Sequence, residues 1–349
     1  MNQCRYKFID IAKGIGIILV MMGHFFIYGS TPTRVIYAFH MPMFFFLSGL
    51  FLSAPQATSI KDKTFWQYIW KKTKRLFLMY CLFFALSIVA VAIFDHKTYP
   101  VKRIVKAFLG NRLRTFHMGP IWFLLALYLV TVLYALLHLC RFQLLHTWEK
   151  FLLMMMLVFG AYKFPRFMSR FGLSFMPLFI NTLPMVLFFV LLGTICKRQI
   201  FDVPSVPLGH RILITTVSLM VTLVVAFKYL DFIAVMTGSF GKDLFPFLFA
   251  ATTGTIAVIF GSSLLVNHLP GRALAYIGQH TMFLLGMHRI VSYYCTKIFY
   301  AIFKVKIAPA KNLPNGYALL WTILMLLVLL ALDWMFLKIL HLWGMHTKA

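Results

Sequence analysis

The sequence has 349 residues, of which 61% are hydrophobic, 17% aromatic and 12% charged. Soluble proteins average about 45–50% apolar and about 25% charged residues, so this composition excludes an ordinary soluble domain. Apolar stretches of about 20 residues recur along the chain, and that length lets an α-helix cross a hydrocarbon core of roughly 30 Å. Lipid cannot satisfy backbone polar groups, so spans must be helical or form a closed barrel. The sequence predicts an all-α, polytopic integral membrane protein.

The net charge of +26 comes from 34 Lys and Arg residues against 8 Asp and Glu residues. On a soluble protein such an excess of basic residues would indicate binding to nucleic acid. Here the bases lie mainly in short connections, where anionic headgroups, phosphate-bearing cofactors or acidic glycans are the expected partners, and nucleic acid is not. The alternative, that the bases are mostly topology signals and lipid anchors, stays open.

We expect about ten spans within a single membrane-embedded domain, residues 1–349. Their expected limits are near 8–28, 35–53, 76–94, 120–140, 151–163, 176–196, 212–230, 244–267, 274–296 and 317–340. The fifth is short, and the ninth is interrupted by polar residues and glycines: Gly278, Gln279, His280, Gly286, His288 and Arg289. No internal repeat or separate soluble domain is evident.

The excess of Lys and Arg in cytoplasmic loops predicts a cytoplasmic N-terminus. Arg5 and Lys7 precede the first span, which lacks a small-residue cleavage site and is expected to be a retained signal anchor. The connection 29–34 has only Arg34, whereas 54–75 is strongly basic. The connections 95–118 and 297–316 are also basic. With these included, the count of Lys and Arg does not discriminate between the two orientations of the chain in the membrane. If the outer face is basic, a negatively charged or phosphate-bearing acceptor would explain it.

The first span contains the most informative ionisable residues, because such groups are costly in lipid and mark function. The eleven-residue step from Lys13 to His24 is about 20° more than three full helical turns, so both side chains share a face, separated by roughly 16 Å of rise. Asp10 lies within ion-pair reach of Lys13. This stripe offers a carboxylate and an ammonium near the cytoplasm and an imidazole deeper in the membrane, suited to move a proton. Alternatively, Lys13 extends to the headgroups and His24 bonds a neighbouring helix.

The second and third spans continue this pattern. His40 precedes Pro42 in the second span, and Ser48 with Gly49 follows, a pair that most often permits close helix packing. At the start of the third, Lys72 and Arg75 are spaced to share a helix face. The two bases are either solvated charge or a site for the phosphates of a nucleotide-bearing cofactor.

Later in the chain, Trp122 lies at an expected membrane boundary, where tryptophan is commonly an interfacial anchor. His288 and Arg289 are adjacent ionisable residues that are not expected to face lipid. Asp333 is expected to pair with a base. The sequence contains no P-loop, dinucleotide fingerprint or metal-binding His-Glu pattern, so we predict no metal, and the five dispersed cysteines indicate no disulfide framework.

Taken together, these motifs resemble the bacterial membrane acyltransferase-3 family. The resemblance spans about residues 5–340 and rests on Lys13 and His24 separated by ten residues, the Phe-Phe-Phe-Leu-Ser-Gly run at 44–49, Lys72-x-x-Arg75, Trp122-Phe123-Leu124 and Tyr276-Ile277-Gly278 leading to His288. His40-Met41-Pro42 is similar to the fucose 4-O-acetylase-like branch.

The resemblance implies transfer of an acyl group, commonly acetyl, from acetyl-CoA or another acyl-CoA on the cytoplasmic side to a hydroxyl of a glycan. It places the protein in the bacterial inner membrane. His24 would be the essential catalytic residue, and Lys13, Lys72 and Arg75 would contact the donor. Lys stands here where relatives often have Arg, which weakens bidentate phosphate binding.

The sequence therefore predicts a membrane O-acyltransferase for a cell-surface glycan or its lipid-linked precursor. His24 is expected to act as general base or to be transiently acylated, with His288 or His40 assisting proton movement or substrate placement. Asp10, Ser48 and Trp122 are supporting residues. Two alternatives remain: a transporter or flippase for an anionic glycan, and a non-catalytic partner in a glycan assembly complex. Against the transporter alternative, the sequence shows no evident repeated halves or membrane-embedded carboxylates of the kind typical of transporters.

Overall fold

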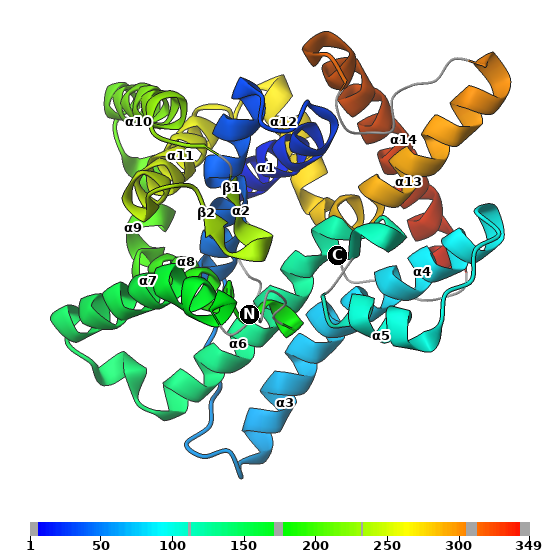
Figure 1. The fold of residues 1–349 in the computed structure, drawn as a ribbon. Coiled ribbons are helices and arrows are strands. Elements are labelled where there is room, and N and C mark those ends of the chain that lie inside the picture. The colour runs from blue at the N-terminus through cyan, green and yellow to red at the C-terminus, as the bar shows by residue number, and fades with distance from the viewer. Residues whose placement is uncertain (1–5, 111–112, 171–176, 232, 305–312, 343–349) are drawn as a thin grey trace.

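The protein is a bundle of packed helices with a short hairpin of strands (Figure 1). The computed structural model describes residues 6–110, 113–170, 177–231, 233–304 and 313–342. The longer helices are α1 (Lys7–Phe25), α2 (Thr31–Leu50), α3 (Lys63–Lys72), α4 (Leu78–Phe94), α6 (Trp122–Leu139), α7 (Thr147–Ser169), α8 (Leu183–Ile195), α10 (Leu208–Lys228), α11 (Leu244–Leu264), α12 (Leu269–Gln279), α13 (Thr281–Phe303) and α14 (Asn315–Leu342).

Shorter elements connect these helices. They are the π-helical turn η1 (Thr73–Phe77), α5 (Val101–Phe108), α9 (Lys197–Phe201), and the 3-10 turns η2 (Leu113–Phe116), η3 (Gly119–Ile121), η4 (Phe142–Leu144), η5 (Pro177–Phe179), η6 (Val203–Ser205) and η7 (Val235–Thr237). Strands β1 (Ile233–Ala234) and β2 (Ser239–Phe240) pair antiparallel, with Ile233 opposite Phe240.

The helical membrane fold predicted from composition is confirmed. Seven helical segments of the described chain are long and apolar enough to cross a membrane: Lys7–Phe25, Lys63–Phe94, Gly119–Leu139, Pro177–Ile195, Leu208–Lys228, Leu244–Leu264 and Gly316–Lys338. The other three expected spans are also helical, as α2, α7 and α12 with α13. The predicted interruption of the ninth span is present, because α12 ends at Gln279 and α13 begins at Thr281.

Helix α1 lies within the bundle and defines two ends that are used below. The Lys13 end is the end of α1 that carries Asp10 and Lys13, and the His24 end is the end at which α1 stops just after His24. At the Lys13 end, the Lys7 ammonium donates to the Val266 carbonyl oxygen at 2.5 Å. Phe51, which follows α2, lies beneath the Lys13 ammonium at 5.0 Å from ring centroid to Nζ.

Close backbone contact between α1 and α12 fixes the Lys13 end. A Cβ at Gly278 would lie 1.8 Å from the Asp10 carbonyl oxygen, and a Cβ at Gly14 would lie 2.0 Å from the Leu274 carbonyl oxygen. Small residues let helix backbones approach in membranes, where packing replaces much of the hydrophobic driving force. The glycines therefore hold Asp10 and Lys13 beside α12.

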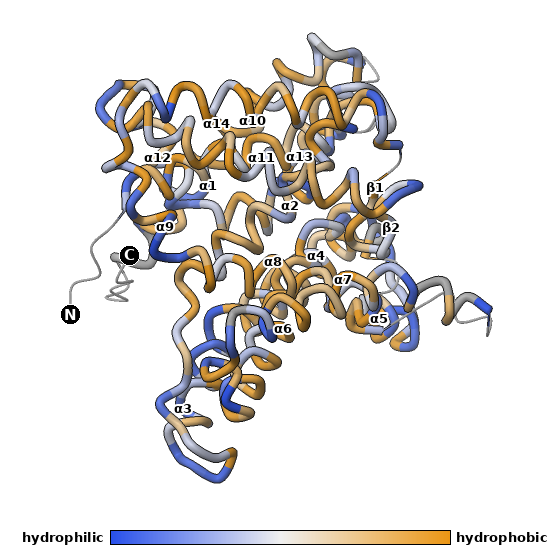
Figure 2. Tube along the Cα trace, turned by 90° about the vertical axis from the view of Figure 1, so that its left-hand side faces the viewer, coloured by the Kyte–Doolittle hydropathy of each residue, from blue (hydrophilic) through white to orange (hydrophobic). Residues whose placement is uncertain are grey.

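Helix α3 projects from the main body, and hydrophilic residues gather near its start and its end (Figure 2). The helical path continues from α3 through η1 into α4, so the expected third span begins at Lys63. Along this path, Lys72 lies 23 residues before Asp95, or roughly 34 Å at the α-helical rise. The start and the end of this long segment therefore lie far apart.

Candidate active site

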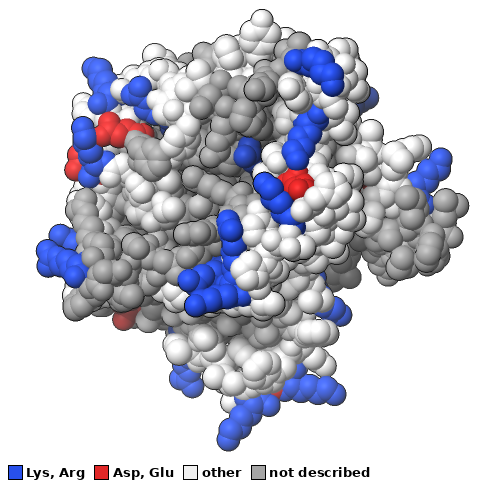
Figure 3. Space-filling model, turned by 45° about the vertical axis from the view of Figure 1, so that its right-hand side comes forward, with Lys and Arg blue, Asp and Glu red and all other residues white. Residues whose placement is uncertain are grey.

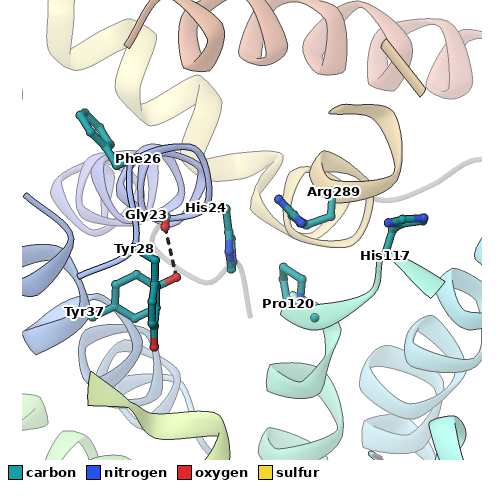
Figure 4. Close-up of a pocket in the computed structure, with 9 residues that line it drawn as sticks. Gly23, His24, Phe26, Tyr28, Tyr37, His117, Pro120 and Arg289 are labelled. Atoms are coloured by element: carbon teal, nitrogen blue, oxygen red, sulfur yellow. Dashed lines mark hydrogen bonds between the residues drawn. The ribbon is translucent and has the colours of Figure 1, made fainter. Parts of the chain in front are cut away.

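A cavity of about 250 Å³ opens at the His24 end of the bundle. Its lining comes from the end of α1, the residues just after it, α2, the turn before α6, and α13. The lining residues are Gly23, His24, Phe26, Tyr28, Tyr37, His117, Gly119, Pro120 and Arg289. Figure 4 shows His24 between the two tyrosines on one side and Arg289 with His117 on the other. Segments distant in sequence therefore meet around one imidazole.

His24 lies in the last turn of α1. The sequence predicts a first span that continues to residue 28. The helix instead ends at Phe25, and the following residue is extended. The imidazole lies in the wall of the cavity.

The structure brings His24 and His288 together. Their ring centroids are 5.3 Å apart, although the residues come from α1 and α13. The His288 side chain is fully buried, with 0% exposure. Its Nδ1 lies 2.9 Å from the Leu284 carbonyl oxygen, to which Nδ1–H donates. Since Nδ1 then carries the proton, Nε2 is the acceptor of the neutral ring.

The Nε2 atom of His288 is buried and has no hydrogen-bond partner among the described residues. An orphaned polar atom in a protein interior is costly and calls for an explanation. Adjacency to His24 supplies one, because His288 can accept or orient a proton shared with that ring. The sequence predicts that His288 or His40 assists proton movement, and the ring contact places His288 beside His24.

His40 reaches the same region from α2. It is 3% exposed, and its Nδ1–H donates to the Ile36 carbonyl oxygen at 2.6 Å. The ring packs edge-on against Tyr37 at 5.0 Å, and Tyr37 packs in turn against His24 at 6.4 Å. Tyr37 also donates its hydroxyl to the Gly23 carbonyl oxygen at 3.1 Å. Tyr37 therefore links the two histidines and ties α2 to the end of α1.

A second, apolar cavity of about 80 Å³ adjoins the first. His24, Tyr28, Tyr37, Gly119 and Pro120 line both, and the second adds Val20, His40, Met41, Trp122, Ala234, Val235, Met236 and Leu285. Trp122 is 5% exposed and packs against Phe45 at 5.8 Å. The tryptophan is thus part of the cavity wall, and the interpretation of Trp122 as an interfacial anchor is wrong.

His117 lies in the short connection before α6 and forms the rim of the larger cavity. Its φ of 56° is left-handed, a backbone conformation that non-glycine residues rarely adopt and that clusters at functional sites. The ring stacks on Tyr293 with centroids 3.6 Å apart. Burial, and then the nearby charge of Arg289, lower the pKa of His117 to about 4. His117 is therefore neutral near pH 7.

The predicted donor residues do not line these cavities. Lys13 Nζ lies 3.4 Å from the Asp10 carboxylate, as the spacing predicted, and Asp10 is 7% exposed. Lys72 is half-buried, with its ammonium 5.3 Å from the centre of the Tyr68 ring. Arg75 is exposed. These charges lie elsewhere on the bundle.

Lys72 and Arg75 do not follow one regular α-helix. Lys72 ends α3, and Thr73–Phe77 form a π-helical turn. The wider π turn increases the angle between side chains three residues apart, so the shared face predicted from α-helical spacing is altered. Thr73 in this turn bonds the Tyr128 hydroxyl on α6 at 3.1 Å. Single π turns occur frequently at functional sites, which keeps this segment a candidate for donor binding.

Ser48 occupies a packing position. Its hydroxyl donates to the Phe44 carbonyl oxygen at 2.8 Å. A Cβ at the adjacent Gly49 would lie 2.1 Å from the Val190 carbonyl oxygen, and Gly193 approaches α2 equally closely. At this pair α2 therefore packs closely on α8.

Sequence reasoning did not assign roles to Tyr28 and Tyr37 or to the hairpin that supplies Ala234, Val235 and Met236. The three-residue spacing of Tyr37 and His40 would have placed both on one face of α2. No comparable signal marks the hairpin, because its cavity residues are small or apolar. Arg289 was noted beside His288, and the structure gives it a separate position in the wall of the larger cavity.

These features define a membrane enzyme whose neutral and cationic side chains surround a cavity at one end of the bundle. The chain belongs to the acyltransferase-3 family, because the family model described as an acyltransferase domain matches residues 6–343. It is therefore a membrane acyltransferase. No curated protein and no solved structure matches the chain.

Proposed function

We propose that the protein transfers an acyl group, with acetyl as the expected one, from acyl-CoA to a hydroxyl of a cell-surface glycan or its lipid-linked precursor. The observation that carries this proposal is the position of His24 in the cavity wall, 5.3 Å between ring centroids from His288. His40-Met41-Pro42 on α2 supports the fucose 4-O-acetylase-like branch, and the proposed location is the bacterial inner membrane.

In the proposed reaction, the acceptor hydroxyl enters the larger cavity and His24 removes its proton as the oxygen attacks the thioester carbonyl. The new C–O bond forms, the C–S bond breaks, and CoA leaves as a thiolate that takes the proton back. His288 orients His24 or shares its proton through Nε2, and Tyr37 holds the end of α1 in place. The pocket thus supplies a base and a fixed geometry.

The donor is proposed to bind from the Lys13 end, with its phosphates near Lys13, Lys72 and Arg75. Lys13 and His24 are separated by roughly 16 Å of helical rise, which the pantetheine arm of CoA can span. A cytoplasmic N-terminus would place this end where acyl-CoA is made. The acceptor would then approach from the opposite side of the membrane.

The test is to replace His24 with Ala in the full-length protein in nanodiscs and to measure transfer from radiolabelled acetyl-CoA to candidate glycans. We expect the turnover rate to fall by about 10²- to 10⁴-fold, the usual contribution of a general base. His210, exposed at the start of α10, provides the matched control H210A, which should transfer normally.

Unchanged transfer by H24A, at equal protein abundance in the membrane, would overturn the assignment of His24. Glycan movement into vesicles without acyl-CoA and without acylated product would instead favour the transporter alternative. Trapping of a labelled acyl group on the protein, lost in H24A, would show that His24 is acylated rather than acting as a base.

A further inference from the structure

The larger cavity combines a reactive imidazole with a fixed positive charge. Among the described residues, the polar side chains that line it are those of His24, Tyr28, Tyr37, His117 and Arg289, and none of these is acidic. Arg289 is half-buried on α13, directly after His288. Consecutive helical residues point about 100° apart, so His288 can pack into the bundle while Arg289 faces the cavity. In Figure 4 the guanidinium lies between His24 and His117.

The nearby carboxylate of Asp95 is engaged outside this wall. It accepts an ion-paired hydrogen bond from Lys297, and the Tyr293 hydroxyl donates to it at 3.5 Å. The charged groups that act on His117 are Arg289, Lys297 and Lys97 on the positive side and Asp95 on the negative side. Three cations against one carboxylate leave the rim of the cavity positive.

The surface of the protein also carries more positive than negative charge. Lys and Arg far outnumber Asp and Glu on the face drawn in Figure 3. Exposed cations favour the approach of an anion, but salt screens their effect and they do not fix the orientation of a bound anion. Arg289 differs from them because its planar group offers paired N–H donors that match the oxygens of a carboxylate or phosphate. A binding role therefore falls on Arg289 rather than on the surface lysines.

We propose that the larger cavity is an acceptor subsite for an anionic group, a carboxylate or phosphate of the glycan, bound by Arg289. This inference rests on the proposed function and adds the chemical class of the acceptor. Anchoring the anion at Arg289 would present a neighbouring hydroxyl to His24. His117, held by its stacking on Tyr293, forms the rim beside the anion and is neutral near pH 7.

The experiment measures binding of three probes to the purified full chain in nanodiscs without acyl-CoA. Methyl glucuronide carries a carboxylate, methyl glucoside 6-phosphate carries a phosphate, and methyl glucoside is neutral. Wild type should bind one or both anionic probes at least about tenfold more tightly than the neutral one, the range expected for a charge-assisted hydrogen bond. The anionic probe that binds more tightly shows whether the subsite prefers a carboxylate or a phosphate.

R289Q should remove this preference, and R289K should keep part of it because Lys retains the charge without the planar fork. K228Q is the matched control, since Lys228 is an exposed cation at the end of α10 outside the cavity lining. The wild-type preference should also weaken as ionic strength rises, a measurement that needs no variant to fold.

Equal binding of all three probes to wild type, or an anionic preference that survives in R289Q, would overturn the subsite. H24A separates this result from the proposed function, because it should retain the anionic preference and lose acyl transfer. Transfer by wild type without an anionic preference would refute the subsite alone. An anionic preference in a wild-type protein that transfers nothing would refute the proposed function alone.

Discussion

The two ends of α1 are built in different ways. At the His24 end, side chains from α1, α2 and α13 converge, and ring contacts connect His24 with Tyr37 and His288. At the Lys13 end, close backbone contact between α1 and α12 positions a paired ammonium, Lys13 with Asp10. Chemistry on a bound hydroxyl requires tightly held reacting atoms, whereas a flexible ammonium can hold a phosphate as a point charge. The difference matches the proposed division between acceptor chemistry and donor binding.

The largest effect on stability should come from filling the contact between α1 and α12 at the Lys13 end. In G278A the new Cβ would meet the Asp10 backbone oxygen, so the helices must separate. We expect a loss of about 1–3 kcal/mol of stability, typical of overpacking, seen as a lower midpoint of thermal unfolding in detergent. Binding of acyl-CoA should weaken as Asp10 and Lys13 move.

Gly160 on α7 provides the matched control, because nothing lies within 4 Å of the Cβ that Ala would add. G160A should be as stable as wild type or slightly more stable, since Ala is favoured over Gly within helices. Equal thermal midpoints for G278A and G160A would show that the close α1–α12 contact does not stabilise the Lys13 end.

The second prediction concerns donor affinity. K72Q should raise the KM for acyl-CoA by about tenfold, close to the 1.4 kcal/mol of one lost charge contact, and should change kcat little. Lys71 is the adjacent, exposed base on the same helix, so K71Q removes the same charge outside the half-buried position. A similar rise in both variants would mean that Lys72 acts only as part of a general positive surface.

Sequence reasoning predicted features that depend on local spacing. The Lys13–Asp10 pair follows from a three-residue step on a helix, and the interruption at His280 follows from glycine and polar residues inside an apolar stretch. Recurring apolar stretches also gave the membrane fold. All of these depend on periodicity within one segment.

Features that depend on tertiary packing were missed or misjudged. Trp122 has the same sequence context whether it anchors at an interface or lines a cavity, and only the positions of Phe45 and α2 decide between them. The π turn after Lys72 and the end of α1 at Phe25, before the expected limit at residue 28, were also not predicted. The meeting of His24 with His288 joins residues 264 positions apart, beyond any periodicity.

The smallest expected effect tests the electrostatics of the His24 end. Burial and the charge of Arg289 lower the pKa of His117 to about 4, whereas an unfolded His titrates near 6.5. Between these values the unfolded chain binds more protons than the folded chain, so the stability that His117 contributes is complete above about pH 6.5 and is lost as the pH falls toward 4. Arg289, Lys297 and Lys97 oppose protonation and Asp95 favours it.

H117Q should therefore lose less stability than wild type between pH 7 and pH 4.5, measured as the difference in thermal midpoint for each protein. Comparing slopes rather than absolute stabilities removes the cost of losing the stacking contact with Tyr293. H210Q controls for the loss of a histidine at an exposed position. Parallel slopes for H117Q and wild type would contradict the lowering of the His117 pKa by burial and by the charge of Arg289. In that case the charge at the His24 end would be tested by R289Q rather than by the titration of His117.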